Sequence, residues 1–406
     1  MVVSFDEYIE RRHTGSIKYD KYAFNRDDSS MKYRPNTIPM WVADMDLPSP
    51  PGVIKAISER ARHGIFGYTA PTWKNTATIL SYLQKKHRVA AKPKDLVFLP
   101  GLVVALNLVS RLAARQNLSI MTAAPVYPPF MSAPIISGTE RWISRLRKCK
   151  SSNRWTFDFD QMHKTINENA NATRKIGWFL LCNPHNPTGR VYTRPELEEL
   201  AEFCERYEIN ICADEVHCDL ILDETCNHIP FSHIKDNRLI TLHAPSKTYN
   251  LAGLATAFAI ITEDKLRVDF KREMRGICAD SNIFGITAMC AAYDEGESWR
   301  LNLIEYLRGN LRLIEETLAP LDIFQHKHEA TYLAWLNAEK LYSIHKGTKT
   351  NSKQRFADRI LVDFDLGFNA GEDFGPSPTD YSKYVRLNFG CPRHVLEEAL
   401  SRLVPP

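Results

Sequence analysis

Short apolar runs alternate with amphipathic segments through the middle of the chain. Residues 195–207 have apolar positions at helical spacing, and Thr193 and Glu196 at their start form the pattern of a capping box. Helices are also indicated at 53–62 and 102–112. Apolar strands separated by amphipathic helices predict an α/β protein whose mostly parallel sheet is covered on both faces. The apolar runs, which have the length of buried strands, cover residues 119–123, 176–182, 209–213, 239–242 and 255–261.

The pattern changes in the last third of the chain. One long helix is predicted at 299–318, and strands at 331–336 and 384–389 precede a closing helix at 394–403. The first 45 residues are polar and then rich in proline, which favours an extended arm over a free domain. We therefore predict three parts, namely a large domain at 46–289, a small α+β domain at 290–406, and an N-terminal arm, 1–45, that completes the small domain.

The composition excludes several classes of partner. The chain has 406 residues, of which 44% are hydrophobic and 25% are charged, and a net charge of +4 without a block of lysine and arginine. It therefore has enough apolar residues for a core but lacks the basic patch of a nucleic-acid or membrane-surface protein. The first residues are charged and include no long apolar segment, so we expect neither a signal peptide nor a membrane anchor. Nine cysteines without a C-x-x-C pair fit reduced thiols, and we expect a cytoplasmic protein.

Polar side chains follow four of the predicted strands. They are Tyr127, Asn186, Asp214 and Lys247. Taken singly, they have ordinary explanations: a packed loop aromatic, a rigid turn, a helix-capping acid and a solvated lysine. Taken together, they lie at the edge of an open α/β sheet where ligands bind. An amine, an acid, an amide and an aromatic ring suit pyridoxal 5′-phosphate (PLP), because the amine bonds to its aldehyde and the acid pairs with its ring nitrogen.

A further candidate is Arg386, which lies within the apolar segment YVRLNF. An arginine that faces inward needs an anion, and its guanidinium suits a carboxylate. An arginine that faces outward is only a surface residue. The periodicity of the segment does not decide between the two.

Eight stretches of the sequence match a known family, in the family's order, between residues 11 and 393. They are RRHTGSIKYD, PMWVADMDLPSPP, HGIFGYTAP, APVYPPF, LLCNPHNPTGRVYT, ADEVHCDLIL, APSKTYNLAGL and YVRLNFGCPR. The chain resembles the fold-type I PLP enzymes of the aminotransferase class I/II group. Within that group it is most similar to the MalY/PatB-type cystathionine β-lyases, which are also called C–S lyases. Eight stretches over nearly the whole chain are far more specific than any one of them.

The resemblance implies PLP as the cofactor and assigns residues to it. Lys247 is then the Schiff-base lysine and the acid/base at the substrate Cα. Asp214 pairs with the pyridine nitrogen and Tyr127 stacks on the ring, and these two residues and Lys247 are the expected catalytic residues. Asn186 and His217 are expected near the phenolic oxygen of the cofactor. The phosphate is expected to bind at a helix N-terminus and beside it, at Gly101, Leu102, Val103 and Ser246.

The resemblance also implies a homodimer and a class of substrate. Tyr68 is expected to reach the phosphate in the neighbouring subunit, so that the active site lies at the subunit interface. Arg386 is expected to hold the α-carboxylate of a small amino-acid thioether. The remaining substrate contacts are expected from Trp41, Tyr68 and Asn186. We expect no metal, nucleic acid or membrane to take part.

The sequence departs from the family pattern in three places. Relatives often have a serine and an arginine on the phosphate where this chain has Ala244 and Ala255, so we expect weaker cofactor retention. The usual Gly-Asp before APVYPPF is replaced within 115–118, and residues 346–355 form a polar stretch. We interpret these last two departures as marks of a member devoted to a specialised conjugate.

The reaction that the resemblance implies is β-elimination from a cysteine S-conjugate to a thiol, pyruvate and ammonia. Two alternatives stay open. One is a PLP-dependent aminotransferase on the same scaffold, and the other is a non-catalytic regulatory protein that keeps the fold. The sequence does not identify the S-conjugate.

Overall fold

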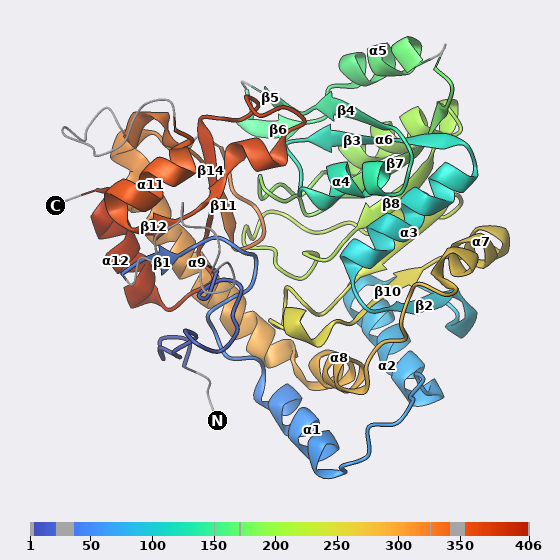
Figure 1. The fold of residues 1–406 in the computed structure, drawn as a ribbon, viewed down its shortest axis with the longest axis horizontal. Helices are drawn as coiled ribbons and strands as arrows, with labels where there is room; N and C mark the ends of the chain where they lie inside the picture. Colours follow the sequence, from blue (N-terminus) through green and yellow to red (C-terminus); the bar gives the residue numbers. More distant parts are fainter. Residues whose placement is uncertain are drawn as a thin grey trace, which may run out of the picture.

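The computed structural model describes residues 4–21, 36–149, 151–169, 172–324, 326–341 and 354–404. Most of the polar stretch predicted at 346–355 lies outside these residues. The described part forms two units, one around a seven-stranded sheet and one around a three-stranded sheet (Figure 1). None of the described helices is long and apolar enough to cross a membrane.

The large sheet confirms the predicted α/β architecture. Its strands are parallel except for β10, which runs antiparallel to both of its neighbours. Both faces of the central strands are buried, which explains why they are continuous apolar runs in the sequence. The strand order is β2 (Leu96–Leu99), β10 (Ala257–Ile260), β9 (Leu239–His243), β8 (Asn210–Asp214), β7 (Lys175–Cys182), β3 (Leu118–Ala124) and β4 (Arg141–Arg145).

Helices cover both faces of this sheet. Along β7, Trp178 and Leu180 pack with α3 (Leu102–Arg115) and α7 (Asp264–Met274), whereas Phe179 and Leu181 pack with the helices of the opposite face. That opposite face is covered by α5 (Phe159–Asn169) and α6 (Arg194–Arg206). The predicted capping box begins α6, because the Thr193 N–H donates to Glu196 Oε2 at 2.8 Å. The elements at the margins are α4 (Pro129–Ile136) and the hairpin of β5 (Arg147–Cys149) and β6 (Arg154–Thr156).

The second unit contains the end of the chain and receives the N-terminal arm. Its sheet has the order β11 (Leu333–Asn337), β14 (Tyr384–Asn388) and β13 (Asn369–Ala370). The arm crosses to it as β1 (Ile38–Pro39), which pairs in parallel with β12 (Leu366–Gly367), so the blue and orange-red segments lie together in Figure 1. Its helices are α9 (Glu297–Leu318), α11 (Phe356–Phe364) and α12 (Arg393–Leu403). The domain boundaries given above stay predictions.

Three other helices of the described part do not belong to the helices named above. They are α1 (Pro51–Arg62), α2 (Trp73–Tyr82) and α8 (Ile283–Glu295). Most predicted elements differ from the observed ones by only one or two residues at an end. The strand predicted from residue 255 begins at Ala257 instead, because Ala255 has a left-handed backbone with φ of 46° that cannot join the ladder.

Candidate active site

A cavity of about 210 Å³ opens where the carboxyl ends of the large sheet meet the segment before α1. Such an edge is the place where open α/β sheets bind ligands. Nine of the ten sequence-predicted cofactor residues line this cavity. They are Gly101, Leu102, Val103, Tyr127, Asn186, Asp214, His217, Ser246 and Lys247.

Lys247 follows β9 and points its amine across the cavity. Its Nζ donates a hydrogen bond of 2.7 Å to the carbonyl oxygen of Ala43, which lies about two hundred residues earlier in the chain. Burial lowers the pKa of Lys247 to about 8, and Arg386 adds to this effect, whereas Asp44 and Asp214 oppose it. An amine with such a pKa is partly neutral near physiological pH, as a nucleophile or general base must be.

Asp214 is the last residue of β8, at the centre of the sheet. Its carboxylate accepts a hydrogen bond of 3.1 Å from the Val216 N–H. Its exposed fraction is only 5%, and burial raises the pKa of Asp214 to about 7, against the opposing effects of that N–H and of Lys247. Among the described residues, no cationic side chain lies within ion-pair distance of Asp214. A buried acid of this kind is costly unless a ligand supplies the positive partner.

Arg386 faces inward from β14. Its Nη1 donates to Asn186 Oδ1 at 3.0 Å and its Nη2 to Asn369 Oδ1 at 2.7 Å. Its Nε is buried and has no hydrogen-bond partner among the described residues, none of which forms an ion pair with it. Burial lowers the pKa of Arg386 to about 10. The structure therefore decides what periodicity left open: the guanidinium is buried, and it lacks an anion.

Tyr127 and His217 line the cavity from two different loops. The Tyr127 N–H donates to the Asn186 carbonyl at 3.1 Å, which ties the loop after β3 to the turn after β7. Burial raises the pKa of Tyr127 and lowers the pKa of His217 to about 3, so both side chains are neutral. His217 Nδ1 is buried and has no partner among the described residues.

One end of the cavity is suited to an anion, although no arginine is among the described residues that line it. Gly101 caps α3, whose first N–H groups belong to Leu102 and Val103, and a helix N-terminus attracts a phosphate. A Cβ at Gly101 would meet nothing within 4 Å, so this glycine leaves open space. Ala244 and Ala255 also line the cavity, at the positions where the sequence departs from the family pattern.

Three sequence-predicted residues do not line the cavity, namely Arg386, which reaches it only through its contact with Asn186, and Tyr68 and Trp41. Tyr68 is fully exposed on the surface of the chain. Trp41 is buried within the arm, where its indole N–H donates to the Lys18 carbonyl at 2.8 Å. Their roles in binding stay predictions. The unusual link at 115–118 is also remote, because it begins about 14 Å along α3 from Leu106, the last residue of that helix to line the cavity.

Sequence reasoning missed three residues of the site. Ala43 contributes a carbonyl oxygen, and no side-chain pattern identifies a backbone acceptor. Asp44 acts on the Lys247 amine from the same loop. Cys182, the last residue of β7, lines the cavity as a buried thiol whose pKa burial raises. Its place at a strand end was the only signal in the sequence.

These groups fit PLP on observations of the structure alone. The amine of Lys247 and the cation-free carboxylate of Asp214 open onto one cavity, and the α3 N-terminus faces the same space. The buried guanidinium of Arg386 adds a site for a carboxylate. The aldehyde of PLP would meet an amine, its pyridine nitrogen a carboxylate and its phosphate a helix N-terminus. The carboxylate of an amino acid would meet a guanidinium.

Comparison with known proteins agrees with this geometry. The family described as Aminotransferase class I and II matches residues 36–403. The chain belongs to this family. It is 31% identical over 409 aligned residues to cystathionine β-lyase PatB of Bacillus subtilis (strain 168), with 99% of each chain covered.

Solved structures of similar proteins have the same fold over nearly the whole chain. The crystal structure of OvoB superposes with a TM-score of 0.85 at 34% identity and covers 99% of this chain and 100% of its own. The PLP-bound C–S lyase of Staphylococcus hominis has a TM-score of 0.85 at 27% identity and covers 99% and 97%. The predicted membership of the class I/II group and the fold-type I architecture are thus confirmed.

Proposed function

We propose that the protein is a PLP-dependent carbon–sulfur β-lyase that cleaves a cysteine S-conjugate to a thiol, pyruvate and ammonia. The observation that carries the proposal is the opening of the Lys247 amine and the Asp214 carboxylate onto one cavity, at the ends of adjacent strands β9 and β8. The relatives support the reaction class, since they include proteins named cystathionine β-lyase and PLP-bound C–S lyases.

The cofactor is PLP, and the residues that would hold it are those of the cavity. Lys247 would bind it covalently, and Asp214 would face its ring nitrogen. Tyr127, Asn186 and His217 would surround the ring. When bound, PLP supplies an electron-accepting ring that stabilises negative charge at the substrate Cα. Its phosphate would lie at the N-terminus of α3, beside Gly101, Leu102, Val103 and Ser246.

Lys247 is the residue that we expect to move the proton at Cα. Its lowered pKa, about 8, leaves part of the amine neutral near neutral pH, so the amine can accept the Cα proton. Proton transfer by a positioned side chain of this kind contributes roughly 10²–10⁴-fold to rate. The electron pair of the Cα–H bond forms the Cα–Cβ double bond as the β-thiolate leaves with the electrons of the C–S bond. Hydrolysis of the remaining enamine gives pyruvate and ammonia.

Arg386 is the residue that we expect to orient the substrate. Its unpartnered Nε and its amide partners Asn186 and Asn369 leave the guanidinium fixed and able to bind the α-carboxylate. Fixing the amino acid at its carboxylate places Cα and its proton relative to Lys247.

We further propose a homodimer in the cytoplasm. Apolar side chains are strongly exposed around Tyr68, which itself projects fully from the surface. The Phe66 ring packs on Phe284 of α8 with centroids 5.5 Å apart, so this patch is ordered. Several large apolar side chains exposed in one short segment favour an interface, and a second copy would bring Tyr68 to the neighbouring cavity. The exposed members of the patch are Ile65, Phe66, Tyr68 and Trp73.

The decisive experiment mixes purified holoenzyme with cystathionine and other S-conjugates in the absence of any keto acid. Release of thiol and pyruvate in equal amounts supports the lyase. Turnover that requires a keto-acid acceptor supports the aminotransferase instead. A protein that does not take up PLP at all supports the non-catalytic alternative. Lys247→Ala is the matched variant, and turnover retained in it would refute the role of Lys247.

A further inference from the structure

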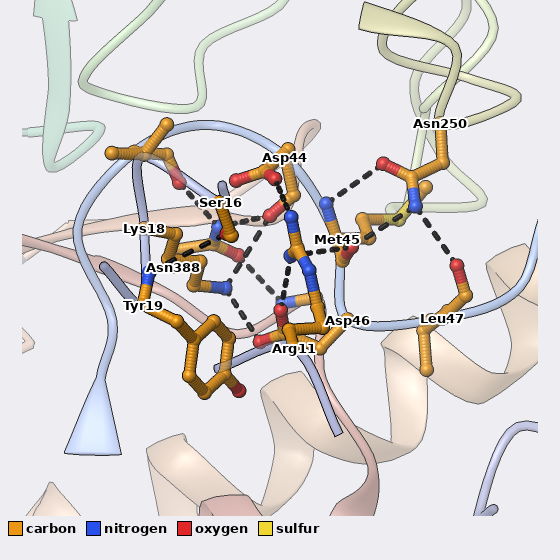
Figure 2. A network of polar contacts seen from close by, with 12 residues as sticks. Arg11, Ser16, Lys18, Tyr19, Asp44, Met45, Asp46, Leu47, Asn250 and Asn388 are labelled. Atoms are coloured by element: carbon orange, nitrogen blue, oxygen red, sulfur yellow. Dashed lines mark hydrogen bonds and ion pairs between the residues drawn. The ribbon is translucent and has the colours of Figure 1, made fainter. Parts of the chain in front are cut away.

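The loop of residues 42–47, whose Ala43 lines the cavity, is fixed by its carbonyl groups. Side chains from distant parts of the chain donate to almost every carbonyl oxygen of this loop (Figure 2). Ala43 is the residue in this loop that matters to the active site, because its carbonyl accepts from Lys247 Nζ at 2.7 Å. Val42 has a φ of 39°, a left-handed conformation that an isolated loop would not keep.

The N-terminal arm supplies two cations to this loop. Arg11 spans two carboxylates, with Nη2 on Asp44 and Nη1 on Asp46 at 2.5 Å each. Lys18 Nζ lies 2.6 Å from Asp46 Oδ2 and 3.4 Å from the Asp44 carbonyl. Lys18 is only 1% exposed, so its charge is buried for this contact. Two cations and two carboxylates balance one another, as a partly buried cluster requires.

The other two anchors come from two segments far apart in the sequence, which contribute Asn250 and Asn388. Asn250 lies three residues after Lys247, and its side chain accepts from the Met45 N–H and donates to the Met45 carbonyl, both at 3.0 Å. Asn388, at the end of β14, donates to the carbonyls of Val42 and Asp44 at 2.7 Å each. The loop is therefore held between the lysine segment and the second unit, and the arm closes the third side (Figure 2).

We propose that Arg11 and Lys18 are positioning residues for Lys247, because they fix the loop whose Ala43 carbonyl holds the lysine amine. The inference rests on the proposed function, since it concerns the same lysine. Neither cation lines the cavity, and each acts on it through Asp44 or Asp46.

The charges around Lys247 predict a change in its pKa that a mere loss of fold stability would not cause. The charged groups that act on its amine are Asp44, Asp214 and Arg386. Asp44 Oδ1 is buried and unpartnered among the described residues, whereas Asp44 Oδ2 is neutralised by Arg11. Removing Arg11 leaves the negative charge of Asp44 facing the amine, so the pKa of Lys247 should rise. Removing Lys18 leaves the Arg11–Asp44 pair in place, so it should loosen the loop with a smaller effect on that pKa.

The test measures how fast apoenzyme incorporates PLP at Lys247. Apoenzyme is mixed with PLP over a range of pH, the adduct is reduced with borohydride, and the labelled peptide is quantified by mass spectrometry. The variants are R11M, R11K and K18M. R11M removes the bridging cation, whereas R11K keeps the charge but lacks the two Nη donors that contact Asp44 and Asp46 together. The matched control is D6A, which breaks another contact of the same arm, the one between Asp6 and Tyr306 of α9, away from the loop. Folding of each variant is checked by circular dichroism.

We expect R11M and K18M to label Lys247 roughly 10–100-fold more slowly than wild type, the loss that misplacing a reacting group by about 1 Å causes. The pH profile of R11M should shift to higher pH, R11K should lie between R11M and wild type, and D6A should match wild type. Folded R11M and K18M with wild-type rates and profiles would overturn the proposal, and so would a D6A defect of the same size. If R11M does not fold, the comparison of K18M and R11K with D6A decides. Wild type that fails to label at Lys247 would refute the proposed function itself, which keeps the two failures apart.

Discussion

Arg386 donates a hydrogen bond of 3.0 Å to the side-chain oxygen of Asn186, which joins β14 of the second unit to the turn after β7 of the large sheet. The guanidinium that we propose for substrate binding is thus held by the same turn that lines the cofactor cavity. If Arg386 binds the substrate carboxylate and Asn186 contacts the cofactor, as we propose, this hydrogen bond couples the two.

Replacing Arg386 by lysine should therefore damage substrate binding more than folding. A lysine keeps the charge but cannot bind Asn186, Asn369 and a carboxylate together. We expect kcat/KM to fall by about 10²-fold, corresponding to about 3 kcal/mol, the upper range for a hydrogen bond to a charged group. Steady-state kinetics with a cysteine S-conjugate measure this, with the exposed Arg194→Lys as control. An unchanged kcat/KM would exclude Arg386 from the substrate site.

The stability of the apoenzyme should fall as pH rises through the range in which Asp214 ionises. Burial raises the folded-state pKa of Asp214 to about 7, above the value near 3.9 of an unfolded chain. The folded state therefore binds more protons between these values, and its contribution to stability falls by up to about 1.4 kcal/mol per pH unit. Asp214→Asn should remove this part of the slope and leave apoenzyme that is more stable than wild type at pH 8.

Urea unfolding at several pH values measures the effect. PLP should reverse it in wild type but not in Asp214→Asn, because only the carboxylate gains a cationic partner. Equal pH slopes in the two apoenzymes would contradict the raised pKa.

Incorporation of PLP by the wild-type apoenzyme should itself depend on pH. Only the neutral amine attacks an aldehyde, so the rate should rise as pH passes the pKa of Lys247, about 8. A surface lysine should show this rise only near its ordinary pKa of about 10.4. Labelling of both in one digest, followed by mass spectrometry, compares them directly. A common midpoint for the two lysines would show that burial does not activate Lys247.

Restoring a hydroxyl at the phosphate end of the cavity should strengthen cofactor retention. Ala244 lines the cavity and is buried, so Ala244→Ser places a donor there with little added volume. A hydrogen bond to a charged group contributes about 1.5–3 kcal/mol, which corresponds to PLP dissociating at roughly one tenth of the concentration or less. Equilibrium dialysis followed by visible absorbance measures this. Ala105→Ser, inside α3, is the control for a buried hydroxyl elsewhere.

Subunit mixing tests the proposed homodimer. Lys247→Ala lacks the amine, and Tyr68→Ala lacks the side chain that we expect to serve the neighbouring cavity. Refolding the two variants together should give activity that exceeds the sum of the separate preparations, because one site of each mixed dimer is complete. Activity that is merely additive would mean that Tyr68 does not act across the interface.

The sequence predicted much of this site because strand ends are easy to locate. Asp214 and Lys247 each follow an apolar run, and parallel strands bring their ends together at one edge. The burial of Arg386 could not be predicted, because it alternates with Val385 and Leu387 and shares its face with Tyr384 and Asn388, as a residue on a solvent-facing side also would. Ala43 could not be predicted either, because its contribution is a backbone oxygen placed by contacts with residues hundreds of positions away.

Two other predictions differ from the structure, one made from the family resemblance and one from the apolar pattern. Trp41 was assigned to the substrate by its motif alone, and in the structure its indole donates to Lys18 of the same arm. The strand at Ala257 was predicted two residues too early, since an apolar pattern does not reveal the left-handed backbone of Ala255. Local patterns thus locate elements and their ends, whereas the orientation of a side chain depends on partners that lie far along the chain.

The pairing of β1 with β12 has a consequence for the order in which the protein is made. A ribosome delivers Lys247 and Asp214 long before it delivers Leu366, Gly367 and Asn388, the residues that receive the arm and hold its loop. Until then, β1 has no partner strand and the loop 42–47 lacks the two hydrogen bonds from Asn388. A product truncated before Leu366 would therefore keep Lys247 and Asp214 but would hold the Ala43 loop by fewer contacts.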